Sequence, residues 1–420
     1  MDIDFHNLQN RQLEARRALE ALRAGVPNSE SVLALGSMQP KVIEAFSENL
    51  AGIQKIDRET AVPGLLLGGG FGSGKSHLLE ALAQRALQNQ FVVSKVVVSK
   101  ETPFHNVAAV FRAAIADARV PGRPGSAVNE IAHGINVNSS SYAKLYHWLH
   151  NEGKFIDHRL TASLRLFEQF SSGDEDFTDR LMQFWAGDNL PITELRKRLK
   201  EAGWLAEYDI RAGSEQNLCR DRFIFFARLI RAAGYLGWVI LIDELELIGR
   251  YSMLQRARSY AEITWWREGF NKDPASPITS VLTTVDDFES EVLIRRNDYE
   301  KVPARLRASG KSDQTTIADA AERGMKYLAR DQIKLNSPDD DELNRTYELI
   351  KQIHALAFDW NPPDVAGIER LPSNRMRQYV RSWINEWDLL FMDPHFKPAT
   401  IVTPLGVEFS EDADIEGDRD

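Results

Sequence analysis

The chain has 420 residues, of which 43% are hydrophobic and 27% charged, so it is long enough for one large domain or two to three smaller ones. Its single cysteine, Cys219, excludes an internal disulfide framework, the first residues lack the apolar core of a signal peptide, and no apolar segment approaches the roughly 20 residues that cross a membrane. From these features we expect a cytoplasmic protein. The net charge of −10 argues against a globally basic nucleic-acid-binding protein but allows local basic patches.

Two helices are predicted ahead of the first strand. Residues 7–24 place apolar side chains on one helical face, and this helix ends at Gly25 because Pro27 cannot continue it. Residues 40–53 repeat apolar side chains at spacings of four, four and three residues. Both patterns indicate amphipathic helices that cover a core.

A glycine-rich loop follows the next predicted strand. Residues 62–68 are a short apolar run typical of a buried parallel strand, and residues 77–86 carry apolar side chains at helical spacing. Between them, the chain fits the pattern G-x-x-x-x-G-K-[ST] at every fixed position, through Gly69, Gly70, Phe71, Gly72, Ser73, Gly74, Lys75 and Ser76. The sequence therefore predicts a nucleotide-binding loop of the Walker A type.

Each fixed residue of this loop has a chemical reason. Glycines let backbone N–H groups turn inward around the phosphates without side chains in the way. Lys75 is expected to reach the β- and γ-phosphates, and the Ser76 hydroxyl to coordinate Mg²⁺. His77 lies at the start of the following helix, whose N-terminus would point at the bound nucleotide.

The chain changes character after the next strand and helix. Residues 91–99 are apolar and β-branched, which predicts a strand in the centre of the sheet, and residues 104–118 resume a helical pattern. From residue 119 to 218, turn-rich breaks separate helical pieces that have no strand pattern between them. We interpret this region as an all-helical insertion, and residues 220–235 as the helix that leads to the next strand.

An acidic pair ends that strand. Residues 238–242 are apolar and are followed by Asp243 and Glu244, which is the pattern of a Walker B strand. Parallel α/β sheets bind ligands at the carboxyl ends of their strands, so Asp243 would hold Mg²⁺ there. Glu244 would orient and deprotonate the attacking water. Glu246 is also acidic, and we expect it at an exposed position without a catalytic role.

A polar residue at the tip of a third strand would complete the pocket. Residues 278–284 form a predicted strand, expected between the strands that carry the Walker A loop and the Walker B acids. Thr283 and Thr284 end it, and we favour Thr284 as the hydroxyl that contacts the attacking water or the γ-phosphate. The alternative is that threonine is simply a good strand residue.

The C-terminal third is predicted to be helical. Residues 285–335 are charged and helical, with Pro303 and Gly310 as breaks, and residues 340–357 and 373–390 form two further helices. These last two helices resemble a lid over the nucleotide.

The second lid helix offers an arginine to the nucleotide. With Ser373 as the N-cap, Arg375 lies in the first turn, where the helix dipole disfavours a cation, and could point at the γ-phosphate. The alternative is a solvated basic face that continues through Arg377 and Arg381.

A further arginine would come from a neighbouring subunit in an oligomer. The sequence does not choose among Arg250, Arg295, Arg296, Arg305 and Arg307. The basic segment 295–311 is equally compatible with contacts to a DNA backbone or with an exposed charged helix.

These motifs together resemble the AAA+ class of P-loop ATPases, nearest to its initiator-like clade related to Orc/Cdc6. Two longer segments, residues 16–36 and 239–263, resemble the P-loop ATPases of bacterial BREX phage-defence systems. The chain is more similar to the shorter BrxD type than to the related, longer BrxC type, and the resemblance covers residues 10–395.

The resemblance implies an α/β fold of AAA+ type, with a central parallel sheet, a large all-helical insertion and a C-terminal helical lid. It implies ATP and Mg²⁺ as cofactors, with Val26 and Pro27 beside the adenine. BREX ATPases accompany a methyltransferase, a phosphatase-like protein and often a helicase, which are the expected partners. The long separation of Lys75 from Asp243 departs from the compact AAA+ pattern, so ring geometry and direct DNA binding stay open.

We predict five segments along the chain. They are 1–118 (N-terminal helices and the first half of the ATPase core), 119–218 (helical insertion), 219–335 (second half of the core), 336–396 (helical lid) and 397–420 (an extension with an acidic tail).

Two functions are compatible with this organisation. The first is a Mg²⁺-dependent ATPase of a BREX-type anti-phage defence system, which remodels or loads a partner on DNA. The second is a nucleotide-gated interaction protein with slow turnover. A helicase subunit is a third hypothesis, but we find no second motor core in the sequence.

Overall fold

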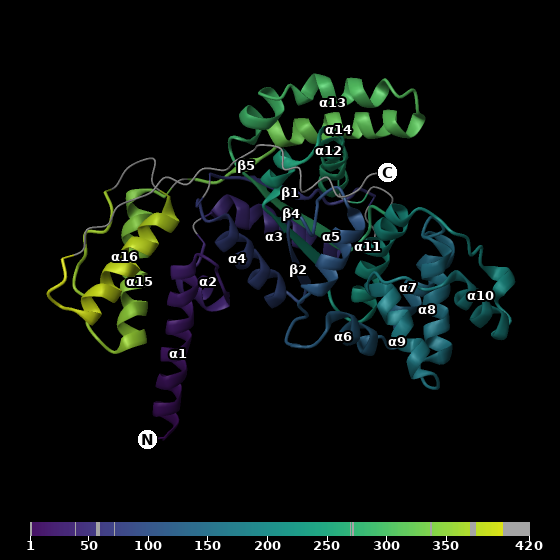
Figure 1. The fold of residues 1–420 in the computed structure, drawn as a ribbon. Coiled ribbons are helices and arrows are strands. Elements are labelled where there is room, and N and C mark those ends of the chain that lie inside the picture. The colour runs from purple at the N-terminus through teal and green to yellow at the C-terminus, as the bar shows by residue number, and fades with distance from the viewer. Residues whose placement is uncertain are drawn as a thin grey trace.

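The computed structural model describes residues 2–37, 39–55, 59–70, 72–268, 270, 273–336, 338–369 and 375–397, with side chains from residue 8 onward. The fold is mixed α/β, with helices on both faces of one parallel sheet (Figure 1). Among the described helices, none is both long and apolar enough to cross a membrane. The predicted C-terminal extension, from residue 398 on, lies outside the described residues.

Five parallel strands form the sheet in the order β2-β3-β4-β1-β5. Their bounds are β1 (Leu65–Gly68), β2 (Val92–Val97), β3 (Trp238–Asp243), β4 (Ile278–Thr284) and β5 (Ile333–Lys334). As predicted, β4 lies between the strands that carry the two Walker motifs. The prediction of a central β2 was wrong, because β2 forms the edge. Its apolar, β-branched sequence reflects burial on both faces rather than a place in the strand order.

The two faces of the sheet belong to separate hydrophobic cores. Leu65, Leu67 and Leu241 face α3 (Pro40–Gln54) and α4 (Lys75–Gln88). The alternate residues, among them Leu66 and Ile242, face the larger core that includes α5 (Val107–Ala116) and α11 (Glu215–Ala232). Side chains of successive strand residues point to opposite faces, so one apolar run fills both cores.

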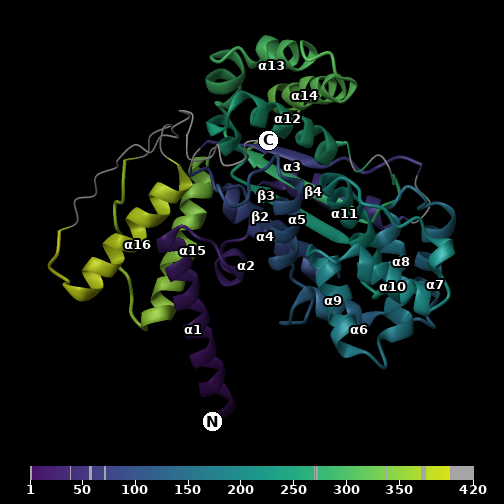
Figure 2. The same cartoon turned by 45° about the vertical axis from the view of Figure 1, so that its right-hand side comes forward.

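Five helices follow one another between α5 and α11. They are α6 (Ala127–Gly134), α7 (Ser140–Asn151), α8 (His158–Phe170), α9 (Glu175–Ala186) and α10 (Ile192–Glu201), followed by a short 3₁₀ turn, η1 (Leu205–Glu207). Every residue from 107 to 232 is described, and no strand of the sheet lies among them. The helices form a group beside α5 and α11 in both views (Figure 2).

A helical hairpin packs against the same larger core as α5 and α11. The 3₁₀ turn η2 (Leu245–Arg250) and helix α12 (Met253–Arg267) follow β3, and the π-helical turn η3 (Glu289–Ile294) follows β4. The hairpin consists of α13 (Asp298–Arg307) and α14 (Ser312–Arg330). Pro303 lies inside α13, so the predicted break there was wrong. Val302, Pro303 and Leu306 are buried, and this packing compensates for the backbone hydrogen bond that proline cannot donate.

The N-terminal and C-terminal helices share a third core. It combines α1 (Asp2–Ala24) with α15 (Asp340–Phe358) and α16 (Met376–Met392), beside the short α2 (Ser29–Leu35), which the sequence did not predict. Arg23 of α1 donates two hydrogen bonds to Asp388 of α16, at 2.9 and 3.0 Å. These helices stand together at one end of the sheet in both views.

Candidate nucleotide-binding site

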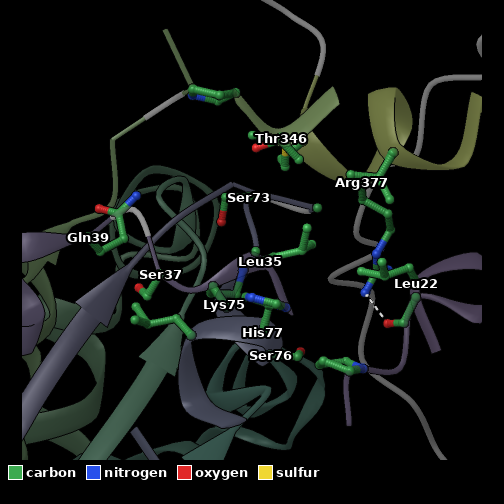
Figure 3. A pocket seen from close by; sticks show the side chains of 18 of the residues that line it. Leu22, Leu35, Ser37, Gln39, Ser73, Lys75, Ser76, His77, Thr346 and Arg377 are labelled. Atoms are coloured by element: carbon green, nitrogen blue, oxygen red, sulfur yellow. Dashed lines mark hydrogen bonds between the residues drawn. The ribbon is translucent and has the colours of Figure 1, made fainter. Parts of the chain in front are cut away.

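A cavity lies where the carboxyl ends of the strands meet the group of α1, α15 and α16. The Walker A loop and the residues after β3 line one side, and residues of α1, α15 and α16 line the other. Figure 3 shows Ser73 and Lys75 of the loop beside Leu22, Thr346 and Arg377 from those three helices. Two of the three hydrophobic cores therefore meet at this cavity.

The loop has the backbone that its glycines predict. Gly72 and Gly74 have φ values of +77° and +94°, in the left-handed region that favours glycine. Helix α4 begins directly after Gly74, so its free N–H groups face the cavity. Gly69 N donates to Thr284 O at 3.1 Å and ties the loop to β4. Phe71 lies outside the described residues.

Lys75 is buried at the base of the loop. Its side chain lines the cavity, and Nζ donates to Gly69 O at 2.6 Å. Nζ also lies 4.0 Å from Glu246 Oε1. An ammonium held there faces the position of phosphates bound by the loop.

Asp243 collects contacts from three elements at the end of β3. Ser76 Oγ donates to Oδ2 at 3.0 Å and Thr283 Oγ1 donates to Oδ1 at 2.6 Å. Lys95 Nζ of β2 lies 3.4 Å from Oδ2. Mg²⁺ prefers oxygen ligands, usually one or two carboxylates together with substrate phosphates. The hydroxyl of Ser76 and the carboxylate of Asp243, at hydrogen-bond distance beside the phosphate loop, fit that preference.

The two threonines of β4 have different surroundings. Thr283 binds Asp243, whereas the Thr284 hydroxyl is buried without a hydrogen-bond partner in the described part of the chain and is absent from the cavity lining. Sequence reasoning favoured Thr284 because it is closer to the strand end. The strand register was the missing signal: Ile242 pairs with Leu282, which puts Thr283 next to Asp243.

Glu244 lies at the rim of the cavity. Its backbone is left-handed (φ +62°, ψ +38°), a conformation that costs free energy for a residue with a side chain. Partial burial and then the negative charge of Asp243 raise the pKa of Glu244. Strained non-glycine residues gather at functional sites, which agrees with the role predicted for this carboxylate.

The burial of Glu246 contradicts the exposed position predicted for it. Glu246 is only 6% exposed and lines the cavity. Its Oε2 has no hydrogen-bond partner among the described residues, and burial raises the pKa of Glu246 to about 7. The cause is local: η2 begins directly after Glu244 and buries Glu246 together with Leu245 and Ile248.

Part of the cavity lining is apolar. Leu22, Leu35, Pro27, Met376 and Val380 form this part, as expected of a pocket for a flat base. Of the two residues predicted beside the adenine, Pro27 lines the cavity. Val26 is 70% exposed and does not line the cavity.

His77 lies beside Lys75 and Ser76 in the cavity (Figure 3). It lines the cavity, and Nε2 lies 2.9 Å from Gly36 O. Burial lowers the pKa of His77, which favours its neutral form. The side chain thereby links α4 to the residue that follows α2.

The two lid arginines occupy different places. Arg375 is the N-cap residue of α16, so it precedes the helix instead of lying in its first turn, and Ser373 is outside the described residues. Arg375 lies against the loop, because a Cβ added to Gly70 would be 3.1 Å from its Nη2. Arg377, which the alternative interpretation placed on a solvated face, lines the cavity and donates to Gly25 O at 3.0 Å. Burial is the largest cause that lowers the pKa of Arg377.

A family model described as "BREX system ATP-binding protein BrxC/D" matches residues 11–387. This range contains every residue of the site described above. No curated protein and no solved structure matches the chain.

Proposed function

The chain belongs to the family of BREX system ATP-binding proteins BrxC/D, and we propose that it is a Mg²⁺-dependent ATPase of the AAA+ type that remodels or loads a partner on DNA. The observation that carries the proposal is the convergence of Ser76 and Thr283 on Asp243, next to the buried Lys75. This arrangement joins the two Walker motifs in one site. The strand order, with β4 between β1 and β3, further supports the hydrolytic class.

The residues of the site have distinct tasks in hydrolysis. The loop N–H groups and Lys75 bind the β- and γ-phosphates, and Ser76 and Asp243 hold Mg²⁺. When bound, Mg²⁺ neutralises charge that develops on the phosphates. Glu244 orients the attacking water from the cavity rim. Catalysis of this kind consists mostly of positioning and electrostatic stabilisation, which suits a preformed pocket.

The remaining parts of the proposal concern further residues and partners. Thr284 and Arg375 stay predictions for the γ-phosphate, and Arg377 joins them because it lines the cavity. Other BREX proteins are the partners that the family supports. Direct contact with DNA, an oligomer and an arginine supplied by a neighbouring subunit are proposed from the sequence alone.

An ATP turnover assay with and without Mg²⁺ and duplex DNA tests this function. We expect Mg²⁺-dependent turnover that is lost in Lys75→Ala, and a reduction of roughly 100-fold or more in Glu244→Gln with ATP binding retained. Turnover that stays at background under every condition, and does not change in Glu244→Gln, would contradict the ATPase. Tight ATP binding in that case would support the nucleotide-gated interaction protein instead.

A further inference from the structure

Glu246 is a buried carboxylate that the proposed reaction has not yet used. It comes three residues after Asp243 and lines the same cavity as Lys75 and Glu244. At 6% exposure it is among the most buried acids of the described residues. Acidic side chains are seldom buried this far unless they are paired or functional.

The pairing of Glu246 is incomplete. Its Oε1 is 4.0 Å from Lys75 Nζ, beyond hydrogen-bond distance, and Nζ donates instead to Gly69 O. Its Oε2 has no partner among the described residues. A buried acceptor without a hydrogen bond is costly, so a native structure that keeps one usually reserves it for a ligand or a water molecule.

The position of Glu246 indicates which ligand that is. Lys75 is expected to reach the β- and γ-phosphates, and Glu246 lines the same cavity with its Oε1 4.0 Å from Lys75 Nζ. A carboxylate would repel the phosphate oxygens themselves. A water molecule next to the γ-phosphate can donate to the carboxylate and keep its lone pair for phosphorus, so water is the fitting partner.

We propose that Glu246 is a second catalytic carboxylate, which accepts a hydrogen bond from the attacking water and takes its proton. The water oxygen forms a bond to the γ-phosphorus, and the bond from that phosphorus to the β,γ-bridging oxygen breaks. ADP leaves with the electron pair, and the proton passes to the Glu246 carboxylate. This step rests on the proposed ATP hydrolysis and adds a residue to it.

In this step Glu244 and Glu246 both contact the attacking water. Glu244 lies at the rim, on a strained backbone, whereas Glu246 is buried. Two carboxylates that act on one water form a unit. Their substitutions should therefore be non-additive, with the double variant little worse than the more damaging single one.

The chain contains a matched control in Glu262 of α12. It is 5% exposed, forms an ion pair with Arg220, and its Oε2 also lacks a partner among the described residues. Glu262 does not line the cavity. Glu262→Gln therefore reproduces the loss of a buried, half-paired carboxylate without touching the nucleotide site.

The experiment compares kcat, KM and ATP affinity in the wild type, Glu246→Gln, Glu246→Asp, Glu262→Gln and Glu244→Gln/Glu246→Gln. We expect Glu246→Gln to lower kcat by about 100-fold with ATP affinity changed less than about threefold. Glu246→Asp should recover part of kcat, because it restores the carboxylate at a shorter reach. Glu262→Gln should keep kcat within about twofold, as expected for a residue outside the cavity.

Each outcome decides the inference. A Glu246→Gln variant that keeps the wild-type kcat overturns it, and the ATPase proposal then still stands on the wild-type turnover. Loss of ATP binding in both Glu246 variants overturns it as well, since that result assigns Glu246 to the architecture of the loop. A wild type that turns over no faster than Lys75→Ala refutes the ATPase and this step together.

Discussion

Asp243 depends on neighbouring hydroxyls for its orientation. Thr283 donates to one carboxylate oxygen and Ser76 to the other, so the side chain is fixed before a cation binds. Partners that orient a metal ligand typically contribute ten- to a hundredfold to metal affinity. We predict that Thr283→Val, which keeps the shape of the side chain, weakens Mg²⁺ activation by about that factor, as measured by Mg²⁺ titration of ATP turnover.

A substitution of Thr284 distinguishes this prediction from the sensor role that the sequence predicts for Thr284. Thr284→Val removes a buried hydroxyl that has no partner in the described structure, so it should leave Mg²⁺ activation within about threefold. A large loss in Thr284→Val with none in Thr283→Val would contradict our account of Asp243. It would favour the sensor role predicted for Thr284.

We expect the buried Glu246 carboxylate to lower the stability of the folded protein at neutral and alkaline pH. Burial raises its pKa from 4.5 to about 7 although Lys75 opposes the shift, with Asp243 and Glu244 adding to it. The folded state then binds the proton more tightly than the unfolded chain, so stability falls as pH rises from about 4.5 to about 7. We predict that Glu246→Gln without nucleotide is more stable than the wild type at pH 8, by as much as about 3 kcal/mol, since each pKa unit corresponds to about 1.4 kcal/mol.

Urea unfolding of both proteins at pH 5 and pH 8 measures this difference. The advantage of Glu246→Gln should largely vanish at pH 5, where the wild-type side chain is mostly protonated in the folded state. Equal stabilities at both values would show that Glu246 has an ordinary pKa. A gain in stability together with a loss of turnover is the signature of a residue kept for activity.

At the level of single residues, the sequence predicted what a motif determines and missed what the local backbone determines. Lys75, Ser76 and Asp243 could be predicted because their chemistry needs fixed neighbours along the chain. Glu246 could not, since its direction depends on the 3₁₀ turn that starts after Glu244. Arg377 was missed because two arginines two residues apart at a helix start give no sign of which one faces the pocket.

At the level of elements, periodicity predicted the long segments and failed on the short ones. β4 has the predicted bounds, Ile278–Thr284, and the apolar positions predicted for α3 are all buried. α2 has seven residues, too few for a helical period to emerge, and it depends on the capping box formed by Asn28 and Ser31. β5 has two residues and gives no sequence pattern at all.

Helix α1 is the element that links the lid to the cavity wall. Leu19 is 1% exposed within the core that α1 shares with α15 and α16, one turn before the cavity residue Leu22. We predict that Leu19→Ala lowers stability by about 2–5 kcal/mol, the usual cost of such a core truncation, and weakens nucleotide binding because the cavity wall loosens. Thermal unfolding and nucleotide titration measure the two effects.

Leu13 of the same helix provides the control. It is 49% exposed, so Leu13→Ala should change stability by less than about 0.5 kcal/mol and leave nucleotide binding intact. If Leu19→Ala lowered stability without weakening nucleotide binding, α1 would be a support for the lid alone. The cavity wall would then be maintained by other elements.

At the scale of the whole molecule, the cavity joins parts that otherwise have separate hydrophobic cores. The loop and α4 belong to the core on one face of the sheet, and α1, α15 and α16 have their own. Beside the cavity, Arg377 N of α16 donates to Gly72 O of the loop at 3.4 Å, and His77 Nε2 of α4 lies 2.9 Å from Gly36 O. A nucleotide that fills the cavity therefore touches both groups at once.

Ligand binding to the folded state alone stabilises it by about 2.7 kcal/mol at a ligand concentration of 100 Kd. Because a nucleotide would touch both groups, we predict that a non-hydrolysable ATP analogue slows amide hydrogen exchange in α1, α15 and the start of α16 as well as in the Walker A loop. The helices α6 to α10, which contribute no residue to the cavity lining, should change little. Lys75→Ala should abolish the effect throughout. Protection confined to the loop would show that α1, α15 and α16 do not respond to the nucleotide. The nucleotide would then bind to the loop side of the cavity alone.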